Sequence, residues 1–198
     1  MNSTEHIDFA LPPRVLGALR TQIFQGTRTI IDLGCGRRKF PGAIGVDAQS
    51  DSDADVRHDL DCLPYPFEGA SADIVIMRHV IEHLADIVAT LREVARILKP
   101  GGRVLVLTPH FSDSSSWIDP THRWHLATRS LEDAAKGLLG LRMTYVKLRK
   151  PWRRLGVERL INNAPFRGRV PKRVVSWEND WCYVIRGGEM SFLLEKPA

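Results

Sequence analysis

Thr29-Ile30-Ile31-Asp32-Leu33-Gly34-Cys35-Gly36 is the most informative segment of the sequence. Its β-branched residues lead into an acidic residue and a glycine turn, a pattern typical of a buried first strand that opens into a ligand loop. Gly34 and Gly36 can adopt positive φ and carry no Cβ, so the backbone can pass close to a bound molecule. The apolar run 43–46 then ends in Asp47, where a doubly wound sheet places the carboxylate that holds ribose hydroxyls. Together these features predict a nucleoside-containing cofactor.

The spacing of the glycines argues against a dinucleotide. A G-x-G-x-x-G fingerprint that starts at Gly34 needs glycine at position 39, which is lysine, and an acidic residue about 20 positions later. Asp47 comes sooner than that. The segments 32–36 and 45–47 instead resemble motif I and its successor in class I S-adenosylmethionine (SAM) methyltransferases, whose cofactor has no pyrophosphate. The chain departs from the small residues common in that family at Arg37, Arg38 and Lys39.

The resemblance implies which residues contact SAM and its product, S-adenosylhomocysteine (SAH). In this assignment the glycine turn lines the methionine part, Asp47 holds the ribose, and Asp59 with Leu60 flanks the adenine. An alternative for Asp59 is a solvated acidic residue in a turn. The complete set implied for the cofactor is Asp32, Gly34, Cys35, Gly36, Asp47, Asp59, Leu60 and Arg78.

Further apolar patterns predict the rest of an α/β fold. The runs 72–77 and 103–108 are typical of central parallel strands, and a helical stripe over 87–98 lies between them before Lys99-Pro100-Gly101-Gly102. This succession also resembles the methyltransferase family. We expect a Rossmann-like seven-stranded, mostly parallel sheet with an antiparallel last strand. The remaining predicted elements are helices over 13–24 and 126–139 and strands over 56–60, 141–148 and 190–194.

Length and composition favour one cytoplasmic domain. The 198 residues are enough to bury a core without disulfides or metal, and 43% hydrophobic and 26% charged residues are ordinary globular values. The three cysteines are scattered without a C-x-x-C pair, which suits a reducing compartment and argues against a thiolate zinc site. Neither an apolar leader nor a run of membrane-spanning length is present in this sequence.

Three histidines are candidate general bases because they follow predicted strands at the edge where doubly wound sheets bind ligands. They are His79, His83 and His110. Methyl transfer to a hydroxyl requires alignment with the donor and loss of a proton, and histidine suits that loss near neutral pH. We therefore expect an oxygen acceptor. Methylation of a flipped base is not expected, because the Asn/Asp-Pro-Pro-aromatic sequence of those enzymes is absent after residue 77.

The polar segment 110–125 allows three interpretations. It could form an acceptor pocket with His122, Arg123 and His125, and this interpretation is preferred. It could hold a metal through His122-x-x-His125 with His110, Asp113 or Asp119, although H-x-x-H alone is a weak signal. It could also be a loop that satisfies its own backbone. No metal ligand is assigned.

Residues 149–182 form a predicted basic lid inserted between the last two strands, with Trp152 as a candidate acceptor contact. The segment could rest on anionic lipid, hold a phosphate- or carboxylate-bearing acceptor, bind a nucleic acid backbone, or be a solvated charged helix. The chain is similar to small methyltransferases of bacterial polysaccharide and secondary-metabolite pathways, which implies a small or carrier-linked acceptor such as a sugar. Nucleic acid is not the expected partner. The alternatives are an RNA methyltransferase and a non-catalytic SAM-binding protein.

Overall fold

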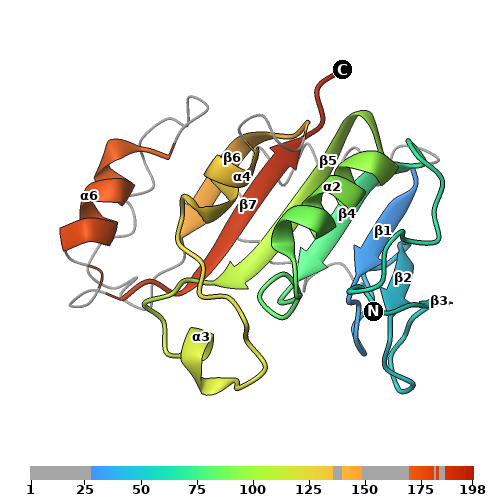
Figure 1. The fold of residues 1–198 in the computed structure, drawn as a ribbon, viewed down its shortest axis with the longest axis horizontal. Coiled ribbons are helices and arrows are strands. Elements are labelled where there is room, and N and C mark those ends of the chain that lie inside the picture. The colour runs from blue at the N-terminus through green and yellow to red at the C-terminus, as the bar shows by residue number, and fades with distance from the viewer. Residues whose placement is uncertain (1–27, 136–139, 149–169, 181, 183–185) are drawn as a thin grey trace, which may run out of the picture.

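A single seven-stranded sheet forms the centre of the molecule (Figure 1). The computed structural model describes residues 28–135, 140–148, 170–180, 182 and 186–198. The strand order is β3-β2-β1-β4-β5-β7-β6. The strands are β1 (Ile30–Leu33), β2 (Ile44–Asp47), β3 (Val56–Arg57), β4 (Ala72–Arg78), β5 (Leu98–Pro109), β6 (Arg142–Leu148) and β7 (Glu189–Glu195).

The direction of the strands confirms the predicted fold class. The pairs β1–β2, β1–β4, β2–β3 and β4–β5 are parallel, whereas β7 runs antiparallel to both β5 and β6. Successive residues of the central strands alternate between two buried apolar clusters. For example, Ile31 and Val75 belong to one cluster, and Ile30 and Ile74 to the other. Apolar side chains therefore cover both faces of the sheet, as expected for central parallel strands.

Two strands differ in extent from their predictions. The strand β3 ends at Arg57 instead of continuing to residue 60, because a turn follows in which Asp59 accepts the amides of Asp61 and Cys62. The strand β5 begins at Leu98, five residues before the predicted start. Its pairing with β4 includes a shift in register between Ala72 and Ile74, and this irregularity accommodates the Lys-Pro-Gly-Gly turn.

Helix α2 (Ile87–Ile97) confirms the predicted stripe and packs on the sheet in front of β4 and β5 in Figure 1. Asp86 caps the helix by accepting the amide of Ala89 at 2.9 Å. Leu91, Val94 and Ile97 are fully buried. Helix α4 (Ser130–Ala135) lies on the same side of the sheet and begins four residues later than predicted. The predicted helix 13–24 and residues 149–169 of the predicted lid, including Trp152, lie outside the described residues.

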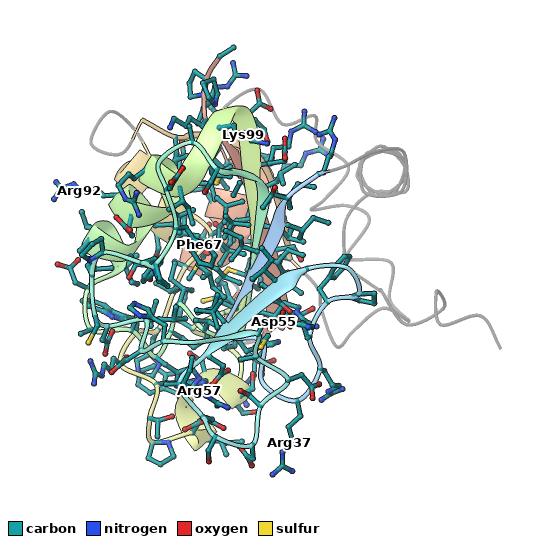
Figure 2. All side chains as sticks on the ribbon, turned by 90° about the vertical axis from the view of Figure 1, so that its right-hand side faces the viewer. Arg37, Asp55, Arg57, Phe67, Arg92 and Lys99 are labelled. Carbon is teal, nitrogen blue, oxygen red and sulfur yellow. The ribbon has the colours of Figure 1, made fainter. Side chains whose placement is uncertain are left out.

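Two short helices lie beyond the sheet. Helix α3 (Ser115–Ile118) lies below the carboxyl ends of the parallel strands in Figure 1, and α6 (Lys172–Asp180) lies to the side of β6. Figure 2 shows Arg37 pointing outward at this carboxyl edge, whereas Lys99 lies at the opposite end. No described helix has both the length and the apolar character needed to traverse a bilayer. The carboxyl edge brings together the side chains considered next.

Candidate functional site

The glycine turn after β1 folds back over the end of β2. The amides of Gly34 and Cys35 donate to the carbonyl of Val46, and both glycines have positive φ, +66° and +54°. A Cβ at Gly34 would lie only 2.3 Å from Cγ2 of Val80, whereas a Cβ at Gly36 would meet no heavy atom within 4 Å. Gly34 is therefore required by packing, and Gly36 faces open space into which a ligand can approach.

Asp32, in β1, fixes the loop 34–42 through hydrogen bonds of its carboxylate. Its Oδ2 accepts from the amide of Phe40 at 2.8 Å and from Nη2 of Arg78 at 2.6 Å, and Arg78 also donates to the carbonyl of Arg38 at 2.5 Å. Burial raises the pKa of Asp32 above its usual value despite the opposing guanidinium of Arg78. Arg78, predicted to contact the cofactor, therefore closes the loop onto the strand in this structure.

Asp47 and Cys35 complete this side of the site. The carboxylate of Asp47 accepts from the amide of Gly36 at 2.9 Å and from the amide of Gln49 at 2.8 Å. Cys35 is buried, and burial together with the carboxylates of Asp32 and Asp47 raises its pKa to about 11. A thiol in this environment has little thiolate character, so Cys35 is a structural side chain of the loop.

Asp59 and Leu60, the predicted adenine contacts, lie in the turn after β3. Asp59 is exposed and its Oδ1 accepts the amide of Asp61 at 3.0 Å. Leu60 is buried, and its carbonyl accepts from the hydroxyl of Tyr65 at 3.1 Å. The contacts of Asp59 are therefore local, and its role toward adenine stays a prediction.

His79 lies directly after β4 in the left-handed conformation, with φ of 55°. Its Nε2 lies 3.0 Å from Glu189 and its Nδ1 lies 3.4 Å from Glu82. The carboxylates of Glu189 and then of Glu82 raise the pKa of His79 to about 9, because both favour its protonated form. Strained backbone of this kind, at a cost of order 1–3 kcal/mol, concentrates at functional sites.

His110 is fully buried at the end of β5 and is hydrogen-bonded at both ring nitrogens. Its Nε2 lies 2.8 Å from Glu178 of α6, and its Nδ1 lies 2.8 Å from the hydroxyl of Ser112, which accepts the amide of Gly187. Glu178 also accepts from the amide and hydroxyl of Thr128. Burial favours the neutral form of Glu178, but these hydrogen bonds outweigh it and hold its pKa below the usual value.

His83 and His122 lie side by side, with ring centroids 4.6 Å apart. Nδ1 of His83 lies 3.0 Å from the hydroxyl of Thr121, and Nδ1 of His122 lies 3.0 Å from the carbonyl of Ser116. His125, by contrast, stacks on Trp117 with ring centroids 3.5 Å apart. The structure therefore brings the ring of His122 against that of His83, whereas the ring of His125 lies against Trp117.

Arg123, the remaining described residue among the predicted acceptor contacts, is exposed, and its Nη1 lies 3.3 Å from Oδ2 of Asp61.

The sequence did not predict Glu178 and Glu189, which bind His110 and His79. They lie 68 and 110 residues from those histidines. Thr121 lies inside the Asp-Pro-Thr-His segment, whose density of polar residues was the available signal.

Comparisons with known proteins agree with this fold. Residues 4–136 match the family described as a methyltransferase domain. A probable SAM-dependent methyltransferase of Mycolicibacterium smegmatis is 43% identical over 82 residues, which cover 40% of this chain and 30% of that protein. The chain spans less than a third of the length of the curated relatives it matches.

Two solved structures share the fold. A SAM-dependent methyltransferase from Archaeoglobus fulgidus superposes with a TM-score of 0.65 at 19% identity, over 92% of this chain and 94% of that one. A phosphoethanolamine N-methyltransferase from Haemonchus contortus, with SAH bound, gives a TM-score of 0.56 at 21% identity over 93% of this chain and 53% of that one. The chain therefore belongs to the methyltransferase domain family, within the class I SAM-dependent methyltransferases.

Proposed function

We propose that this chain transfers the methyl group of SAM to a hydroxyl of a small or carrier-linked acceptor such as a sugar. The observation that carries the proposal is the hydrogen bonding of His83. Thr121 donates its hydroxyl to Asp119 at 2.6 Å, so the same oxygen accepts the Nδ1 proton of His83. This leaves Nε2 of His83 as the nitrogen with a lone pair, as a general base requires.

The transfer is an in-line displacement. The acceptor oxygen attacks the methyl carbon, the bond from carbon to sulfur breaks, SAH leaves, and the hydroxyl proton passes to Nε2 of His83. The other two candidate bases are less suited in this arrangement. His79, with a pKa of about 9, carries its proton at neutral pH, and both nitrogens of His110 already bind protein groups.

Two partly exposed indoles of the segment 110–125 support a sugar as acceptor. Trp117 and Trp124 are 61% and 41% exposed, and Ile118, next to Trp117 in the chain, is 76% exposed. Each indole N–H donates to a backbone carbonyl, that of Phe111 or that of Leu84, so the rings are fixed in place while part of their surface faces solvent. Rigid aromatic faces of this kind suit the apolar faces of sugar rings at low entropic cost.

The assignment of the cofactor residues is tested by calorimetric titration with SAM and SAH, with NADH as the control ligand. We expect micromolar binding of both sulfur ligands by the wild-type chain and loss of binding in Asp47→Ala. Asp47 holds the amide of Gly36 as well as the proposed ribose hydroxyls, so its removal affects both. Equal affinity of Asp47→Ala and wild type would contradict this assignment.

The proposed reaction is tested with a panel of nucleotide sugars and lipid-linked sugars, by mass spectrometry of the methylated product and of SAH. We expect His83→Ala to lose at least a hundredfold in turnover while it keeps its affinity for SAM. His79→Ala and His110→Ala serve as comparisons. Full turnover by His83→Ala on the true acceptor would refute the role of His83, and SAM binding without product on every acceptor would favour the non-catalytic alternative.

A further inference from the structure

The loop 119–124 is tied to the segment after β4 at one backbone atom. The amides of Arg123 and Trp124 both donate to the carbonyl of Glu82, at 2.8 and 3.1 Å. These bonds bring His122 over Glu82 and His83. One potential ligand atom from each of these three side chains then lies within 4.8 Å of the other two.

In both imidazole rings Nδ1 has a hydrogen-bond partner within the protein. Nδ1 of His83 donates to Thr121, whose hydroxyl is in turn oriented by Asp119, and Nδ1 of His122 donates to the carbonyl of Ser116. The lone pair of each ring is therefore on Nε2. Metal-bound histidines characteristically donate their second ring N–H to a carbonyl or to a carboxylate-linked group, which fixes the ring and its tautomer.

Glu82 supplies an independent observation. The residue has no exposed surface, and neither carboxylate oxygen has a hydrogen-bond partner among the described residues. Its Oε1 lies 3.4 Å from Nδ1 of His79 as an ion pair. Its Oε2 has no hydrogen-bond partner among the described residues, and a bound cation would satisfy this buried oxygen.

We propose that Glu82, His83 and His122 bind a divalent transition-metal ion. Two imidazole nitrogens and one carboxylate oxygen favour Zn²⁺ or Fe²⁺ over Ca²⁺ or Mg²⁺, which prefer oxygen ligands throughout. Three protein ligands leave at least one position for water or for an oxygen of the acceptor. His125 does not belong to this group of ligand atoms within 4.8 Å of one another, and its ring instead stacks on Trp117.

This inference deepens the proposed function and changes one role within it. With the metal bound, His83 is a ligand and does not act as the base. The metal then lowers the pKa of the bound acceptor hydroxyl, whose proton passes to water before the oxygen attacks the methyl carbon. Metal binding is measured without an acceptor, so its failure leaves the methyl-transfer proposal standing, with His83 as the base.

The test is calorimetric titration of the chelator-treated full chain with ZnCl₂, together with the visible spectrum of its Co²⁺ complex. We expect one Zn²⁺ per chain, and at least tenfold weaker binding in Glu82→Gln and in His122→Ala. His125→Ala is the matched control and keeps the wild-type affinity. The Co²⁺ spectrum should lack the charge-transfer band of thiolate ligands, which excludes Cys62 as the site. Affinity for SAM checks that each variant is folded.

Three outcomes would overturn the proposal. The first is absence of Zn²⁺ binding by wild-type protein that still binds SAM. The second is a thiolate band in the Co²⁺ complex. The third is an equal loss of affinity in His125→Ala and His122→Ala, since this would move the site to the H-x-x-H pair.

Discussion

Asp32 and Glu82 are both carboxylates without exposed surface near the carboxyl edge of one sheet, yet their surroundings differ. Asp32 accepts two hydrogen bonds through Oδ2, one from a backbone amide and one from Arg78. Neither oxygen of Glu82 has a hydrogen-bond partner among the residues that the structure describes. We infer that Asp32 organises the glycine loop in the absence of ligand. For Glu82, the proposed metal ion would supply the partner that the carboxylate lacks within the described residues.

The largest expected effect is on the Asp32 side. Arg78→Leu should lower the free energy of unfolding by about 3 kcal/mol, because it leaves a buried carboxylate without its cation. The measurement is urea unfolding followed by fluorescence. Arg37→Leu is the control, since the side chain of Arg37 is 75% exposed (Figure 2) and pairs with Asp51 at the surface. Equal losses in the two variants would show that the Asp32–Arg78 pair does not organise the loop.

A second test concerns the loop above Asp32. Gly34→Ala should lower the free energy of unfolding by about 2 kcal/mol, because alanine is strained in the left-handed conformation and its Cβ would also clash with Val80. Gly36→Ala should lower it by only about 1 kcal/mol, since its Cβ meets no heavy atom and the conformational cost alone remains. A double-mutant cycle with Val80→Ala should recover part of the loss at Gly34 and none at Gly36. Equal coupling at both glycines would contradict the different packing assigned to them.

Whether a region can be predicted from the sequence depends on how far apart along the chain its contacting residues lie. Asp32, the glycine turn and Asp47 lie within sixteen residues, 32–47, so their local spacing brings them together, and the mostly parallel sheet with an antiparallel last strand is as expected. The acceptor side depends on long-range partners. His110 meets Glu178 across 68 residues, and no local pattern predicts that contact. Sequence reasoning likewise grouped His122 with His125, because the fold of the loop, not the spacing, turns His122 toward Glu82.

The buried pair of His110 and Glu178 gives the acceptor side a measurable pH dependence. The pKa of Glu178 is lower in the folded chain than its ordinary value of 4.5, so its contribution to stability is present above about pH 4.5 and is lost as pH falls through the folded pKa. Glu178→Gln should remove this part of the slope and cost about 1–3 kcal/mol at pH 7. Urea unfolding between about pH 3 and pH 7 measures both effects.

The control for this titration is Glu68→Gln, because Glu68 is exposed. It should leave both the stability at pH 7 and the slope unchanged within about 0.5 kcal/mol. If Glu178→Gln keeps the wild-type slope, the carboxylate does not connect α6 to the end of β5 in the manner described.

The smallest expected effect is the most direct test of the contrast between the two carboxylates. Without metal, Glu82→Gln should change the free energy of unfolding by less than about 1 kcal/mol, because the amide removes a buried charge without hydrogen-bond partners, and His79, its ion-pair partner, keeps the carboxylate of Glu189. Asp32→Asn, in contrast, should destabilise the chain, because it weakens the bond to Arg78. Added Zn²⁺ should raise the thermal unfolding temperature of the wild type and leave that of Glu82→Gln unchanged, since only a ligand that binds the folded state stabilises it. A large loss in Glu82→Gln without metal would mean that Glu82, like Asp32, already has its partners within the chain.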